Sequence, residues 1–75
     1  MSDKKFKIIT ETISKIIKID PRLVNEMTYR ENFSKWDSLA HLNLMLELEK
    51  KFDKKVSTSK MNDLDSVKKI FQYFK

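Results

Sequence analysis

The sequence contains no glycine, and its only proline is Pro21. Glycine supplies, at low cost, the positive backbone φ angles that tight β-hairpins require, so hairpins are difficult to build in this chain. Helices with short connectors are therefore favoured over sheets. The 75 residues suffice for one modest core and leave little room for a buried catalytic pocket. We accordingly expect a single all-α domain over residues 1–75.

Apolar periodicity predicts a small four-helix bundle with three longer helices and one short helix. The predicted longer helices cover residues 4–18, 38–52 and 66–74. Residues 53–65 are polar with scattered apolar anchors, and we expect a single short helical turn there. A proline after Asp20 ends the first helix and opens a short turn over 21–24, which places Leu23 or Val24 in the core.

Residues 25–37 show no clean periodicity and predict a long first loop. Within it, Phe33 is the best candidate for a side chain that anchors the loop to the core, and we also expect Trp36 to pack in the core. A loop of this length in so small a domain usually carries function.

The helix predicted over 38–52 carries two apolar stripes where a bundle helix needs only one. The expected core stripe consists of Leu44, Met45, Leu48 and Phe52. The second stripe, rotated away from the first, consists of Leu39, Leu42 and Leu46. We expect this second stripe to be partly exposed, and exposed apolar patches usually mark interaction sites.

The net charge of +5 suggests nucleic-acid binding, but its distribution argues against that function. Residues 1–19 and 50–75 are basic, whereas residues 20–49 hold three cations against six carboxylates, a balance of −3. Lysine also outnumbers arginine fourteen to two, and arginine is the usual residue for bidentate base readout. We therefore expect no nucleic-acid binding.

Several kinds of chemistry are excluded or disfavoured by the residue content. The chain has no cysteine and one histidine, His41, so disulfides and thiolate sites are excluded and we expect no metal site. Ser38 lies near enough for a serine–histidine pair, but no glycine-containing nucleophile turn surrounds it, and we interpret His41 as a surface or core-edge residue.

The amino-terminal residues show no apolar signal segment, and no run approaches the roughly 20 apolar residues of a membrane span. A small domain without cysteine also fits a reducing compartment. We expect a cytoplasmic monomer that does not insert into membranes.

A candidate modification site opens the helix predicted over 38–52. There the triplet Asp37-Ser38-Leu39 follows the long loop and precedes the double stripe. A second triplet, Asp65-Ser66-Val67, opens the last helix, and we interpret its serine as a helix N-cap. The same interpretation is open at the first triplet, where the serine would be an N-cap and the aspartate a cap or a solvated loop charge.

The stretch from Trp36 to Glu49 resembles the start and body of the second helix in acyl carrier proteins. The resemblance extends over nearly the whole chain. Residues 19–28 are similar to that family's first loop, and residues 52–67 are similar to its run from the second helix into the third and fourth. The resemblance implies a carrier domain, which is a substrate of other enzymes and not an enzyme itself.

In that family the serine of the Asp-Ser-Leu motif receives 4′-phosphopantetheine from coenzyme A. The resemblance therefore makes Ser38 the attachment site of a covalent cofactor and Asp37 a residue that helps to engage the phosphopantetheinyl transferase. The resemblance implies a cargo that is an acyl or aminoacyl thioester used in fatty-acid, polyketide or secondary-metabolite biosynthesis. Loading and acyl-transferring enzymes would contact Leu39, Leu42, Asn43 and Leu46.

The chain departs from the common family pattern in two respects. Trp36 replaces a small residue, as in a divergent Trp-Asp-Ser-Leu group associated with dedicated biosynthetic clusters. Asn43, Lys50 and Lys51 stand where carriers often have acids. Two alternatives stay open: a small basic helical domain that binds nucleic acid, and a protein-interaction module without the arm.

Overall fold

The computed structural model describes residues 4–75; residues 1–3, on which part of the expected absence of a signal segment rests, lie outside this range. The described chain contains four α-helices and two single-turn 3₁₀ helices and no strand, which confirms the all-α class. In chain order these are α1 (Lys4–Ile17), η1 (Pro21–Leu23), η2 (Arg30–Asn32), α2 (Ser38–Phe52), α3 (Thr58–Asp63) and α4 (Val67–Phe74). No helix among residues 4–75 is both long enough and apolar enough to cross a membrane.

The helix ends follow local chemistry. Asp37, Ser57 and Ser66 cap α2, α3 and α4 through side-chain oxygens that accept backbone N–H hydrogen bonds. Because the chain has no glycine, residues with a side chain take the left-handed conformation after the two long helices: Lys18 has φ 57° and Asp53 has φ 49°. In this conformation the Cβ atom of a non-glycine residue crowds the backbone, which costs about 1 kcal/mol or more relative to glycine.

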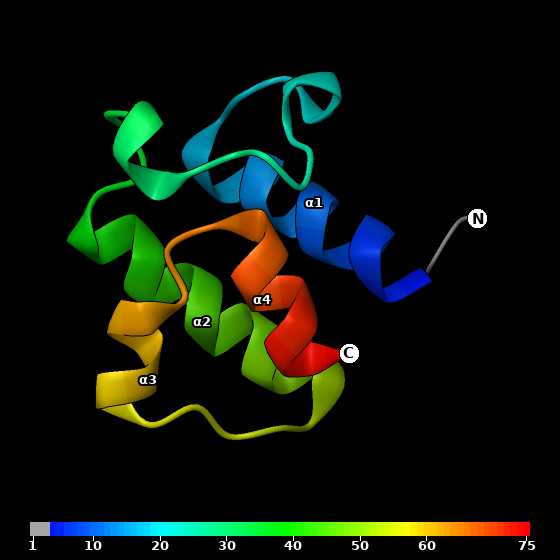
Figure 1. The fold of residues 1–75 in the computed structure, drawn as a ribbon, viewed down its shortest axis with the longest axis vertical. Helices are drawn as coiled ribbons and strands as arrows, with labels where there is room; N and C mark the ends of the chain where they lie inside the picture. Colours follow the sequence, from blue (N-terminus) through cyan, green and yellow to red (C-terminus); the bar gives the residue numbers. More distant parts are fainter. Residues whose placement is uncertain (1–3) are drawn as a thin grey trace.

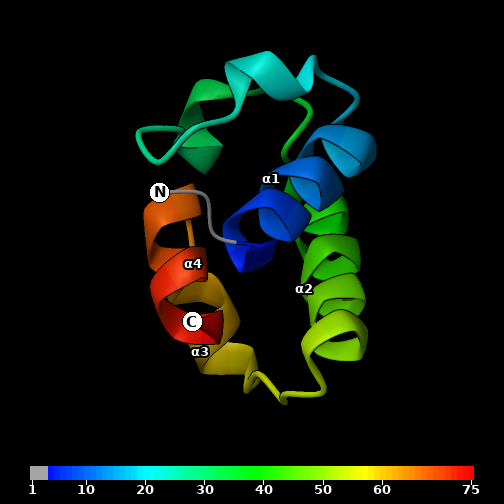
Figure 2. The same ribbon diagram turned by 90° about the vertical axis from the view of Figure 1, so that its right-hand side faces the viewer.

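Helix α1 contacts both α2 and α4, and Figure 2 shows it lying between them. The short α3 lies close to the α4 side of the molecule, after a connection that runs along one end of the helices (Figures 1 and 2). The long loop runs across the opposite end and leads into the start of α2.

The core lies where the apolar stripes of α1, α2 and α4 meet. Its buried members are Ile9, Ile13, Ile17, Val24, Trp36, Leu44, Met45, Leu48, Val56, Leu64, Val67, Ile70 and Phe74. The predicted core stripe of α2 is confirmed for its first three members, while Phe52 is partly buried against this cluster. Of the two candidates in the first turn, Val24 is buried and Leu23 is exposed.

Two aromatic side chains anchor the long loop to the core, and the expected anchor, Phe33, is the shallower of them. Trp36 is 2% exposed and provides the deep anchor, as expected for core packing, whereas Phe33 is only partly buried. The ring N–H of Trp36 has a hydrogen-bond partner inside the protein, the ring of His41. Without such a partner, burial of that group would carry a desolvation cost.

Backbone hydrogen bonds join the loop to the connection between α3 and α4. The N–H of Arg30 donates to the Asp65 carbonyl at 2.8 Å, and the N–H of Val67 donates to the Thr28 carbonyl at 3.0 Å. These bonds form an isolated antiparallel bridge between Tyr29 and Ser66. The loop that lacks periodicity therefore has a defined position beside α4.

Candidate functional site

Ser38 is the first residue of α2 and its side chain is exposed. The N-cap is the preceding residue, Asp37, which has extended backbone angles and whose Oδ1 accepts a hydrogen bond from the Ala40 N–H at 2.9 Å. The alternative in which Ser38 caps the helix is therefore wrong, and Asp37 has that role. The hydroxyl of Ser38 is consequently not needed to begin the helix.

The second triplet has the opposite arrangement. Ser66 is the N-cap of α4, is only 2% exposed, and accepts a hydrogen bond from the Lys69 N–H at 3.2 Å. The expectation that this serine is a helix cap is confirmed. In the first triplet the aspartate is the N-cap and the serine is the first helical residue, whereas in the second triplet the serine itself is the N-cap. The serine of the first triplet is exposed and that of the second is buried.

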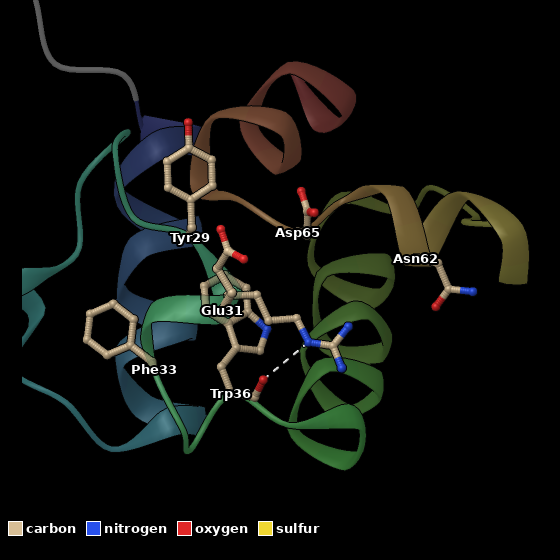
Figure 3. A pocket seen from close by; sticks show the side chains of 7 residues that line it. Tyr29, Glu31, Phe33, Trp36, Asn62 and Asp65 are labelled. Carbon is tan, nitrogen blue, oxygen red and sulfur yellow. Dashed lines mark hydrogen bonds between the residues drawn. The ribbon is translucent and has the colours of Figure 1, made fainter.

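An arginine that the sequence did not single out completes the surroundings of Ser38. Arg30 donates from Nη2 to Ser38 Oγ at 3.3 Å and from Nε to the Trp36 carbonyl at 3.2 Å, the second of which is the dashed line in Figure 3. The turn η2 and the bridge to the α3–α4 connection bring Arg30 there. The only sequence signal is that it is one of two arginines in a lysine-rich chain.

His41 is buried beneath this site and joins the loop to α3. Its Nδ1 accepts a hydrogen bond from Trp36 Nε1–H at 2.9 Å, and its Nε2 lies 2.7 Å from the Met61 carbonyl oxygen. Because a carbonyl only accepts, Nε2 carries the proton and the ring is neutral. With both nitrogens occupied, His41 has none left to act as a base toward Ser38, which excludes a serine–histidine pair.

Of the two positions expected for His41, the surface is wrong, since the residue is 4% exposed, whereas the core edge fits, since it also lines a surface hollow beside Ser38. Burial lowers the pKa of His41, and the hydrogen bond to Met61 opposes that effect. The charge of Arg30 lowers this pKa further, while that of Asp65 raises it. A pattern of residue types could not show this, because the two partners lie in the loop and in α3.

This arrangement predicts a pH-dependent stability. His41 binds a proton less readily in the folded state than in the unfolded chain, where its pKa is about 6.5. The free energy of unfolding should be greatest above about pH 7.5 and should fall by up to about 1.4 kcal/mol per pH unit between about 6.5 and the folded-state pKa. Urea melts from pH 7.5 to 5.5 measure this, above the range in which carboxylates titrate. His41→Gln should flatten the profile; an equal slope in the variant would contradict the assignment.

One surface hollow is lined by Ser38, and a second shares two residues with it. The first, which we call the serine hollow, has a volume of about 140 Å³ and is lined by Ser38, His41 and Leu42 of α2 and by Thr58 and Met61 of α3. The second, the loop hollow, has a volume of about 360 Å³. In Figure 3 its labelled side chains come from the loop on one side and from α3 and the α3–α4 connection on the other. Arg30 and Asn62 line both hollows.

The second stripe of α2 is exposed, as expected. Leu39 is 68% exposed, and Leu42 and Leu46 are 45% exposed. Asn43 is also exposed between them, and beside Leu46 it lines a further hollow between α1 and α2 together with Lys15 and Lys50. The first turns of α2 therefore present apolar side chains and a polar amide beyond an accessible hydroxyl, while Lys15 of α1 and Lys50 of α2 lie further along, beside Leu46.

Comparison with protein-family models and with curated proteins found no match for this sequence. Among residues 4–75, no group of three or more histidine, aspartate or glutamate side chains is placed to hold a metal ion.

Proposed function

We propose that this chain is an acyl carrier protein in which Ser38 bears a 4′-phosphopantetheine arm. The observation that carries the proposal is the release of Ser38 from capping: Asp37 satisfies the helix start, so an exposed hydroxyl stands at the loop–helix junction. A serine needed only for structure would occupy the capping position, as Ser66 does. The four-helix bundle of carriers and a location in the cytoplasm as a monomer belong to the same proposal.

The surroundings of Ser38 fit the group that would be attached. In the transfer, Oγ forms a bond to the pantetheine-bearing phosphorus of coenzyme A, the bond from that phosphorus to the 3′,5′-ADP portion breaks, and the hydroxyl proton is lost to a base. The resulting phosphodiester is an anion at the amino-terminal end of α2, where the helix dipole favours negative charge. The arm supplies a terminal thiol that holds the cargo as a thioester.

The exposed stripe supports a carrier over a module with no arm. Leu39, Leu42 and Leu46 lie on the helix that begins at the attachment site. An enzyme that receives the arm must approach this part of the surface, and apolar contacts give such transient docking its affinity. Asn43 lies within the same surface and is included in the proposed interface. Trp36 serves the fold in this proposal, since it is buried and bonded to His41.

Incubation with coenzyme A, Mg²⁺ and a phosphopantetheinyl transferase tests the proposal. Intact mass spectrometry should show the addition of one arm per chain and no second addition. A nucleic-acid-binding domain, suggested by the net charge, or an interaction module without the arm would keep its original mass. An unmodified chain after exposure to transferases of broad and narrow specificity would refute the carrier function.

A further inference from the structure

In the described part of the chain the guanidinium of Arg30 makes no salt bridge, although Glu31 and Asp65 line the loop hollow with it. Among residues 4–75 the salt bridges join Arg22 to Asp20 at 2.7 Å and Lys69 to Asp65 at 3.1 Å. Arg30 is half-buried and donates only to two neutral oxygens, those of Ser38 and Trp36. A cation that is partly withdrawn from water without a counter-ion is unfavourable, unless an anion binds beside it.

The position of Arg30 is held on two sides. Its backbone N–H donates a hydrogen bond to the Asp65 carbonyl, and its Nε–H donates one to the Trp36 carbonyl. The side chain of Trp36 is itself buried, so this second acceptor is held in place. These contacts direct the Nη2 end of the fork toward Ser38 Oγ, at 3.3 Å. Preorganisation of this kind lowers the entropy that the side chain would lose on binding a ligand.

We propose that Arg30 binds the phosphodiester that links the arm to Ser38, and so acts as a positioning residue for the root of the arm. This inference rests on the proposed function. Once Oγ is esterified, the phosphorus is bonded to the atom that Nη2 already contacts, and the non-bridging phosphate oxygens lie two bonds from that atom. The planar fork of arginine matches two phosphate oxygens at once, which a lysine ammonium does not.

The charge of Arg30 also offsets a local conflict. Asp37 is the residue before Ser38, so its carboxylate lies near the added phosphodiester and repels it. Its Oδ1 accepts from the Ala40 N–H, so this anion is held in place by the helix cap. A guanidinium on the loop side of Ser38 reduces the repulsion without moving the cap.

The test compares the thermal unfolding of the unloaded and the loaded protein in wild type, Arg30→Gln, Arg30→Lys and Arg22→Gln. Loading is verified for each sample by intact mass. Because each variant is compared with its own unloaded form, any effect of the substitution on folding cancels. Arg22→Gln is the matched control, since Arg22 is the other arginine of the chain, lies in η1 of the same connection between α1 and α2, and pairs with Asp20.

We expect the change in Tm on loading to be more favourable in wild type than in Arg30→Gln by about 4 °C, the shift expected from one partly exposed ion pair in a domain of this size. Arg22→Gln should match wild type, and Arg30→Lys should lie between. The difference should shrink in 1 M salt, where the Debye length is about 3 Å. The ³¹P resonance of the loaded protein should also move in Arg30→Gln and not in Arg22→Gln.

Equal changes in Tm on loading in wild type and Arg30→Gln, with an unchanged ³¹P resonance, would overturn the proposal. Arg30 would then only stabilise the loop through its hydrogen bond to the Trp36 carbonyl. A wild-type chain that gains no mass would refute the proposed function and this inference with it. The two failures are distinguished by the mass spectrum, because only the first occurs in fully loaded protein.

Discussion

Replacement of Ser38 by alanine is expected to abolish arm addition, whereas Ser66→Ala should load as wild type does. The hydroxyl of Ser38 is the proposed nucleophile and is accessible; that of Ser66 is buried and bonded to the Lys69 N–H. Stability should respond in the opposite sense. Ser66→Ala removes a helix cap and should cost about 1 kcal/mol, while Ser38→Ala should change the free energy of unfolding by less than about 0.5 kcal/mol.

Intact mass after loading, together with urea melts of both variants, measures this pair of effects. The crossed outcome matters because a change in folding alone cannot produce it: the variant that fails to load is the one that stays stable. A mass shift that survives Ser38→Ala would show that the site is misassigned. A large loss of stability in Ser38→Ala would show that its hydroxyl has a structural role that the cap geometry does not reveal.

Leu48→Ala should destabilise the fold by about 2–5 kcal/mol, because Leu48 is fully buried in the core face of α2 and its truncation leaves a cavity. Leu42→Ala and Leu46→Ala should cost roughly 1 kcal/mol each, since nearly half of each side chain is already in water. The loss in Leu48→Ala is a large fraction of the total stability of a small domain, so its loading assay belongs at low temperature.

The same three variants separate core from interface. Leu42→Ala and Leu46→Ala should slow loading or acyl transfer by a cognate enzyme, because they remove apolar contact next to the arm. Leu48→Ala, when kept folded, should load at nearly the wild-type rate. If Leu46→Ala destabilised the protein as much as Leu48→Ala and loading stayed normal, the second stripe would belong to the core and the proposed interface would not exist.

The pattern of the chain predicted its helices well. Apolar spacing placed α1, α2 and α4 to within a residue of their observed bounds, and the polar stretch after α2 contains the expected short helix α3. The double stripe of α2 was likewise readable, because residues three and four apart on a helix share a face whatever the rest of the chain does. Exposure of Leu39, Leu42 and Leu46 followed from that geometry.

The loop was less predictable. Phe33 and Trp36 are both large and aromatic, and the preference for Trp36 as the deep anchor comes from His41, which accepts its ring N–H. Leu23 and Val24 are likewise both apolar, and the direction of the chain after η1 decides that Val24 is the one buried. Which of two similar side chains is buried depends on the residues that pack against it in the folded protein, and the type of the residue itself does not reveal them.

By itself, the sequence determined the helical class, the helix bounds and the presence of a serine at the start of the longest helix, because these depend on residues within a few positions of one another. Only the tertiary structure decided that Ser38 is accessible beside Arg30 and that His41 is neutral and buried. The hydrogen bonds responsible join the loop to Asp65 and Val67 and join α2 to Met61. Contacts between segments so far apart form only when the core brings the helices together, so no local pattern encodes them.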